Sequence, residues 1–344
     1  MKPVNALPRW RGFNLIEMFS TNTFWQRIFP YEDHGRFLES DFRLISQLGF
    51  DFVRIPMSYL FWNMGADLYK MNEKVMKNMD QVVEWGLKYN IHVSLNIHRS
   101  PGYCINEFDI TNEPVKLNLW RDKEAVDAFA YYWSEFGERY KSISNDTLSF
   151  DLLNEPPSLE ISQTIREDYK RVVTAITEAI RLVDPKRLII ADGLDQGNTT
   201  CPELAELGIG QSCRGYHPWS LSHYKAIWGG NSMQVPTWPN ELCDLTVWTK
   251  ESLAHKYDTW VDLMKLGVGV HCGEMGCHRE TPHEVFLAWM TDLLEVLTER
   301  NIGYALWNFR GPFGLINSGR GDVTYKSYDG FLLDEKLLKV LEKF

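Results

Sequence analysis

The sequence predicts a (β/α)8 barrel, a fold of the α/β class, on three observations. Short apolar, β-branched segments alternate with longer segments of helical period, which is typical of repeated βα units around a parallel sheet. Eight such strand segments occur in 344 residues, and no Pro- or Ser-rich linker separates them. The dinucleotide fingerprint of the alternative, an open doubly wound sheet, is missing, because Gly273 follows Gly267 and Gly269 at the wrong spacing. We therefore expect one domain, a single TIM barrel over residues 1–344, since such barrels exceed the usual domain length of about 150 residues.

The predicted strands are short runs rich in Val, Ile, Leu and Phe. In chain order they are Trp10–Glu17, Phe50–Met57, Ile91–His98, Leu148–Glu155, Arg187–Leu194, Gln211–Pro218, Val268–Gly276 and Ile302–Phe309.

The predicted helices lie between the strands. Several end at a Gly or Asn just before the next strand, as at Gly49, Asn90 and Asn301, which is where helix C-caps place these residues. The helices are Asp33–Leu48, Asn72–Tyr89, Asp122–Tyr140, Glu160–Val183, Pro202–Leu207, Lys250–Leu266, Pro282–Arg300 and Asp334–Lys343.

One segment after the sixth strand, from Trp219 to Thr249, contains no clear strand or helix. It carries four tryptophans, at 219, 228, 238 and 248. Uncommitted loops of this length inside a compact domain are usually lids or binding loops, although an insertion that packs its own small core is the alternative.

The composition limits the partners. With 36 basic and 46 acidic side chains the formal net charge is −10, which argues against nucleic acid or an anionic membrane surface as the main partner and favours a neutral substrate. The aromatic content is 13%, with 13 Trp, 15 Tyr and 18 Phe, more Trp than a core needs, and we interpret the excess as functional. The six cysteines are widely spread, and we expect them to be mostly reduced.

No export or membrane-insertion signal is visible. The segment Met1 to Trp10 lacks an apolar core, and no run of 18 apolar residues occurs. This predicts a cytoplasmic protein, but a secreted protein whose signal has been removed would look the same.

Polar residues at the ends of the strands carry the most functional weight, because barrel active sites lie at the C-terminal ends of the strands. Any one of them could belong to a structural ion pair. Two glutamates that face the same end from different strands are harder to explain in that way. The residues are Arg54, His98, Asn154, Glu155, Arg214, Tyr216, Glu274 and Trp307.

Two carboxyl groups on opposite sides of a pocket, one protonated and one ionised, are what cleavage of a glycosidic bond requires. Arg54 and Tyr216 should lie nearer the ionised group, the nucleophile, because a cation and a hydrogen-bond donor favour the charged form. Trp307 would form the floor under a sugar ring, since sugars present flat C–H faces to aromatic side chains.

Six segments, in order on the expected strands, resemble family 5 of the glycoside hydrolases, the cellulase-like branch of the retaining (β/α)8 clan. The resemblance covers nearly the whole chain, and each segment alone is a weak signal. The segments are Arg11-Gly12-Phe13-Asn14-Leu15, Phe52-Val53-Arg54-Ile55-Pro56, Asn96-Ile97-His98-Arg99-Ser100-Pro101-Gly102-Tyr103, Leu152-Leu153-Asn154-Glu155-Pro156, Cys272-Gly273-Glu274-Met275-Gly276 and Ala305-Leu306-Trp307-Asn308.

The resemblance implies a role for each matching residue. Glu155 would be the general acid/base and Glu274 the nucleophile. The substrate-binding residues would then be Asn154 on the sugar 2-hydroxyl, Arg54 orienting the nucleophile, His98 lining the −1 subsite, Trp307 as its platform, and Tyr216, with a hydrogen bond to Glu274.

The chain departs from the family pattern at two places. Arg214-Gly215-Tyr216 stands where His-x-Tyr is expected, so a permanent charge replaces a group that can be neutral. We count Arg214 among the substrate-binding residues and leave out His217, which strand alternation points to the other face. Arg99 replaces a second His and would contact the substrate or pair with an acid.

Other chemistries fit the sequence less well. A zinc site formed by His271, Cys272, Cys277 and His278 has no distant second ligand pair, and strand alternation would scatter these side chains. No G-x-S-x-G elbow or phosphate-binding loop occurs. A carbohydrate-binding barrel without catalysis is the non-enzyme alternative, but it would have lost one of the two glutamates.

The sequence therefore predicts a retaining glycosidase that cleaves β-1,4-linked glucan by double displacement, as an endoglucanase does. β-Mannanase activity and exo action on oligosaccharides, as by a β-glucosidase or exo-glucanase, are the alternatives. Retention requires the two carboxyl groups to lie about 5 Å apart, whereas more than roughly 6.5 Å would indicate inversion. We expect no metal, no cofactor, no nucleic-acid or membrane partner, and a monomer.

Overall fold

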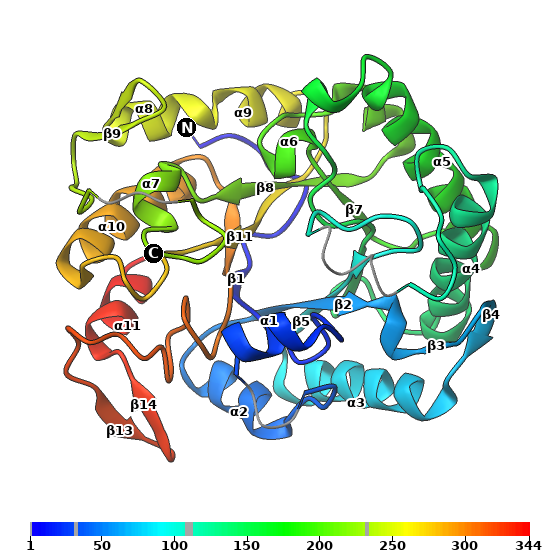
Figure 1. Cartoon of the computed structure of the whole chain (residues 1–344), viewed down its shortest axis with the longest axis horizontal. Coiled ribbons are helices and arrows are strands. Elements are labelled where there is room, and N and C mark those ends of the chain that lie inside the picture. Colours follow the sequence, from blue (N-terminus) through cyan, green and yellow to red (C-terminus); the bar gives the residue numbers. More distant parts are fainter. Residues whose placement is uncertain (1, 31–33, 107–112, 231–233) are drawn as a thin grey trace. The chain divides into compact units, whose positions relative to one another are not determined.

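Eight parallel strands form a closed barrel with helices around it (Figure 1). The computed structural model describes residues 2–30, 34–106, 113–230 and 234–344. The strand order around the barrel is β1-β12-β11-β8-β7-β6-β5-β2, which is the chain order of the eight predicted strands, and the register of each described barrel pair is parallel. The predicted (β/α)8 fold class is confirmed.

Each barrel strand overlaps one predicted strand. Except for Arg11, all their residues are buried, because helices cover the outside of the barrel while side chains fill the inside. The bounds are β1 Arg11–Asn14, β2 Phe52–Ser58, β5 His92–Arg99, β6 Leu148–Asp151, β7 Ile189–Asp192, β8 Gly210–Gly215, β11 Val270–Met275 and β12 Gly303–Leu306.

The helices follow their predicted capping residues. The Asn72 side chain caps α3 by accepting from the Lys74 N–H, and Asn90 ends it at φ 54°, in the left-handed conformation predicted for a C-cap. The helices are α1 Thr23–Ile28, α2 Glu39–Gln47, α3 Glu73–Tyr89, α4 Lys123–Tyr140, α5 Ile165–Val183, α6 Leu194–Gly197, α7 Trp219–Ser222, α8 Lys250–Lys256, α9 Asp258–Met264, α10 His283–Glu299 and α11 Glu335–Leu341, with 3₁₀ helices at Tyr59–Phe61, Leu159–Ile161 and Pro202–Leu207.

The structure corrects several predicted elements, and Asp33, where one predicted helix begins, lies outside the described residues. The segment from Trp219 to Thr249 is not without regular structure, because it contains α7 and a hairpin of β9 and β10. The predicted helix Lys250–Leu266 is two helices, since Tyr257 between them has φ −92° and ψ 0°. The predicted strand Leu148–Glu155 ends at Asp151. The strands of the three hairpins outside the barrel are β3 Asn63–Met64, β4 Asp67–Met71, β9 Glu241–Cys243, β10 Thr246–Trp248, β13 Lys326–Tyr328 and β14 Phe331–Leu333.

The chain forms two compact units, Leu15–Cys213 and Met1–Asn14 with Arg214–Phe344. In the first unit, α3 lies directly on β5: a Cβ added at Gly86 would be 2.5 Å from the Val93 side chain. In the second, the residue before β1 lies so close to the start of β12 that a Cβ at Gly303 would be 2.4 Å from the Trp10 carbonyl oxygen. Glycine is therefore required at both places for steric reasons.

All six cysteines lie in the described part of the chain, and they are buried free thiols, as expected. Among the described residues, no helix is both long enough and apolar enough to span a bilayer.

Buried histidines make the fold sensitive to acid. Burial lowers the pKa of His92 and His278 to about 4 and that of His217 to about 3. Unfolded imidazoles bind a proton near pH 6.5, so between about pH 6.5 and pH 4 the unfolded state holds more protons. The free energy of unfolding should therefore fall as the pH is lowered through this window.

His92 offers a test of this linkage. Its Nδ1 bonds the Asp146 carbonyl and its Nε2 the Ser149 hydroxyl, contacts that an amide can partly replace. In His92→Asn the slope of unfolding free energy against pH should decrease by up to one proton, about 1.4 kcal/mol per pH unit. Urea denaturation at several pH values measures it. The control is His255→Asn, whose side chain is 82% exposed. An undiminished slope in His92→Asn contradicts the prediction.

Candidate active site

Asn154 and Glu155 lie in the turn that follows β6, not on the strand as predicted. Glu155 has φ 46°, a conformation that is uncommon and costly for a non-glycine residue. Its N–H donates to Asp192 Oδ2 at 2.8 Å, and its carbonyl accepts from the Tyr103 hydroxyl. Hydrogen bonds on both sides of the residue thus hold the strained backbone from which the partly exposed Glu155 side chain projects.

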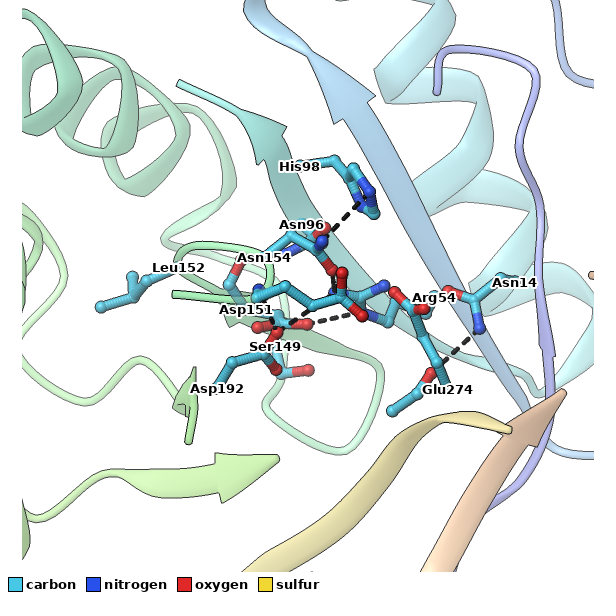
Figure 2. A network of polar contacts seen from close by, with 12 residues as sticks. Asn14, Arg54, Asn96, His98, Ser149, Asp151, Leu152, Asn154, Asp192 and Glu274 are labelled. Carbon is cyan, nitrogen blue, oxygen red and sulfur yellow. Dashed lines mark hydrogen bonds and ion pairs between the residues drawn. The ribbon is translucent and has the colours of Figure 1, made fainter. Parts of the chain in front are cut away.

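A buried guanidinium inside β2 contacts the end of β6 and the residues that follow it (Figure 2). Arg54 is the third residue of β2 and does not lie at the end of the strand as predicted. Arg54 Nε donates to Asp151 Oδ2 at 2.6 Å, and its Nη2 donates to Asn154 Oδ1 at 2.9 Å and lies 3.9 Å from Asp192 Oδ2. Arg54, Asp151, Asn154 and Asp192 are all at most 2% exposed. One cation thus neutralises charge on two strand-end carboxylates and fixes the Asn154 amide.

The orientation of Asn154 determines the protonation of His98. Because Asn154 Oδ1 faces Arg54, its Nδ2 faces His98 Nε2, at 3.1 Å. An amide nitrogen only donates, so Nε2 accepts and the neutral imidazole carries its proton on Nδ1. The ring is also held from the other side by the edge of Phe19, 4.9 Å between centroids.

Glu274 lies near the end of β11 and is 3% exposed. The Tyr216 hydroxyl donates to its Oε2 at 3.0 Å, as predicted, and Arg214 Nη2 lies 3.4 Å from Oε1. The Arg214 backbone is fixed in turn, since its carbonyl accepts from the Tyr257 hydroxyl at 3.1 Å. Arg214 is 1% exposed, so the departure from the family pattern places a permanent charge directly on the second glutamate.

The backbone around Glu274 is irregular. The register between β11 and β12 shifts between Cys272 and Met275, a bulge-like irregularity, and bulges redirect side chains near active sites. Asn14, at the end of β1, donates from Nδ2 to the carbonyls of Gly273 and Leu306, both at 2.9 Å. Asn14 thus ties the bulge to β12.

Trp307 is the first residue after β12. Its N–H donates to the Met275 carbonyl at 2.7 Å, which ties it to the residue that follows Glu274, and its side chain is 6% exposed. Arg99 has a structural contact, because its guanidinium lies 3.9 Å from the centre of the Phe19 ring and donates to the Phe19 carbonyl. His217 packs against Trp248, with 5.2 Å between ring centroids.

The residues weighed as a zinc site take up other contacts. The Cys272 thiol donates to the Glu274 carbonyl, and His278 Nδ1 lies 3.2 Å from the Tyr224 carbonyl. Within the described ranges, no three His, Cys, Asp or Glu side chains form a group that could hold a metal ion.

A family model described as cellulase (glycosyl hydrolase family 5) matches residues 11–311. The chain belongs to glycosyl hydrolase family 5. It is a glycoside hydrolase of that family, and the family resemblance noted in the sequence is confirmed.

Similar proteins match most of the chain. Endoglucanase C of Acetivibrio thermocellus is 23% identical over 329 residues, which cover 87% of this chain and 92% of that protein. A crystal structure described as a glycoside hydrolase is 40% identical, covers 97% of this chain and 99% of its own, and has a TM-score of 0.89. Cel5A of Thermotoga maritima in complex with cellobiose is 20% identical, covers 97% of both chains and has a TM-score of 0.73, and another crystal structure contains it with mannotriose.

Four residues of this family 5 site were missed from sequence. Asp151 and Asp192 are the last residues of β6 and β7. An acidic residue at the end of an apolar strand was therefore the signal that could have identified both. Asn14 and Tyr103 lie inside segments that resemble the family, but their contacts are with backbone carbonyls, which a sequence does not reveal.

Tyr103→Phe should impair the positioning of Glu155. Burial raises the pKa of the Tyr103 phenol well above its usual value, so the hydroxyl stays a donor to the Glu155 carbonyl. Without it we expect kcat to fall about tenfold on oligosaccharides, with KM little changed and a smaller loss on aryl glycosides that need no proton donor. The matched control is Tyr140→Phe, a buried phenol bonded to Asp80, which should keep wild-type kinetics. Equal losses on both substrate types would exclude this role.

Proposed function

We propose that this family 5 hydrolase is a retaining endo-β-1,4-glucanase in which Glu274 is the nucleophile and Glu155 the general acid/base. The setting of Glu274 supports this most directly. The Tyr216 hydroxyl donates to one of its oxygens and Arg214 Nη2 lies 3.4 Å from the other, so the carboxyl group is held in one orientation, as a nucleophile that attacks an anomeric carbon must be. Glu155 lies in a turn, partly exposed, as an acid that must reach a leaving oxygen should.

The proposed reaction has two displacements. In the first, a Glu274 oxygen bonds to the anomeric carbon while the bond to the leaving oxygen breaks and Glu155 gives that oxygen its proton. In the second, Glu155 takes a proton from water, the water oxygen bonds to the anomeric carbon, and Glu274 leaves. Two inversions return the β-configuration.

The remaining strand-end residues would hold the sugar that reacts. Asn154 Nδ2 has two hydrogens, one directed at His98, so it is suited to donate to the 2-hydroxyl as well. His98, with its tautomer fixed, would line the same −1 subsite, and Trp307 would form its floor. Arg54 would contribute indirectly, by orienting Asn154.

The choice of β-1,4-glucan follows the names of the relatives. Endoglucanase C and Cel5A with cellobiose favour a gluco-configured substrate, and Cel5A with mannotriose makes β-mannan the second candidate. Product profiles on cello- and manno-oligosaccharides of increasing length discriminate the two and also report endo or exo action.

Glu274→Ala should abolish turnover, because no other group would form the glycosyl–enzyme bond. Activity is measured as reducing ends released from soluble β-glucan, and circular dichroism checks that the variant is folded. A folded variant that keeps more than a few per cent of the activity would exclude this nucleophile. Proton NMR of the first product formed by the wild type should show the β-anomer, and an α-anomer would indicate inversion.

Glu155→Ala should discriminate between leaving groups. A phenol of low pKa can leave as its phenolate without receiving a proton, so aryl glycosides should react far better than oligosaccharides. Added azide should raise the rate by attacking the glycosyl–enzyme. Kinetics on both substrates, with identification of the β-glycosyl azide, measure this. An equal loss on every substrate would remove Glu155 from the acid role.

A further inference from the structure

Trp219 differs from every other tryptophan of the chain. All 13 lie in the described residues, and Trp219 is the one exposed residue among them, at 39%. It is the first residue of α7 and lies four residues after Gly215, the last residue of β8. Its indole Nε1 donates to the Gly229 carbonyl at 2.9 Å, so the ring has a fixed rotation.

One face of the Trp219 indole is covered by His223. The two rings are stacked, with 3.4 Å between centroids and 11° between planes. Because His223 stacks on this face, we infer that solvent reaches Trp219 mainly from the opposite face and the rim. Trp219 thus presents a flat, apolar surface to solvent and is supported from behind.

The support is itself rigid. His223 is buried, and burial lowers its pKa well below the usual value, so the stacked imidazole is neutral. Ser222 Oγ donates to the Tyr216 carbonyl and therefore accepts from His223 Nδ1, at 2.9 Å. The edges of Tyr216 and the ring of Phe313 enclose the imidazole, at 5.0 and 5.5 Å between centroids. Little conformational freedom is left for a ligand to freeze on binding.

The Trp219 surface lies next to the proposed nucleophile. The Tyr216 ring meets Trp219 edge-on, at 6.4 Å and 80°, while its hydroxyl bonds Glu274. The end of β8 packs on β11, since a Cβ at Gly215 would be 2.7 Å from Met275 Cβ. On its other side β11 pairs with β12, which Trp307 follows. Trp307 and Trp219 therefore flank the strand of Glu274 from opposite sides.

We propose that Trp219 is a stacking platform for the sugar on the leaving-group side of the scissile bond. The proposal rests on the proposed function: with Trp307 under the sugar that reacts, the opposite flank of Glu274 receives the sugar that departs. An uncharged indole face fits the C–H face of a β-linked hexopyranose and needs no charged partner.

The test compares sugar and phenol leaving groups. In Trp219→Ala, kcat/KM on cellopentaose should fall about tenfold, and the loss on an aryl β-cellobioside, which has no leaving sugar, should be at most about twofold. Trp219→Phe, which keeps a smaller ring, should be intermediate. Trp248→Ala is the matched control. It also removes an indole from the segment 219–249, but this indole packs on His217.

Each outcome decides between the possibilities. An unchanged kcat/KM of Trp219→Ala on cellopentaose would rule out Trp219 as a platform. An equal loss on both substrates would rule out its position on the leaving-group side. If the wild type cleaves neither substrate, nor mannopentaose, the proposed function fails instead. Binding then tests the platform separately: cellopentaose or mannopentaose should perturb the tryptophan fluorescence of the wild type, with the change largely lost in Trp219→Ala, and an undiminished change excludes it.

Discussion

The Glu155 part of the site depends on one buried ion pair, between Arg54 and Asp151. The side chains of Arg54 and Asp151 are 1% and 3% exposed, and such charges are costly to remove from water. Removing one partner of such a pair costs about 3–5 kcal/mol. The fork geometry of arginine lets Nε bond Asp151 while Nη2 bonds Asn154. A lysine, with one nitrogen, could not hold both groups in these directions.

The Arg54–Asp151 pair also affects the orientation of the groups around Glu155. Arg54 fixes the Asn154 amide, the amide fixes the tautomer of His98, and Asp192 holds the N–H of Glu155. A buried guanidinium thus sets the orientation of the Asn154 amide and, through it, of the His98 imidazole. Such outer contacts commonly matter as much as the groups they orient.

The two glutamates are presented by different irregularities. A regular parallel strand alternates its side chains between the barrel interior and the helices, which restricts where a carboxylate can be directed. Glu155 lies in a turn with a left-handed backbone, stabilised by Asp192 and Tyr103. Glu274 lies in a bulge of β11 tied down by Asn14. In both cases hydrogen bonds to the backbone, not to the carboxyl group, hold the local distortion.

The sequence predicted the barrel because the periods of strands and helices alternate along the chain, but it could not predict these irregularities. Leu152 and Leu153 continue the apolar run of β6, so the strand seemed to reach Glu155. The β9–β10 hairpin was missed for a related reason. Its two-residue turn is Asp244-Leu245, both at positive φ (49° and 62°), where Asn-Gly or Asp-Gly is the usual signal. The sequence likewise does not show that Arg54 pairs with Asp151, because the pair depends on contacts between distant parts of the chain.

The aromatic content also needs a different explanation from the one that the sequence suggested. Seven of the 13 tryptophans are buried, so about half of them fill the interior of the protein: Trp10, Trp25, Trp62, Trp133, Trp260, Trp289 and Trp307. Even in the segment from Trp219 to Thr249, Trp238 bonds Asp292 on α10 and Trp228 stacks on Phe313. A high count of tryptophan therefore says little about sugar binding. What matters is an indole with one face supported and the other exposed, and among the 13 tryptophans only Trp219 combines a ring-stacked face with an exposed side chain.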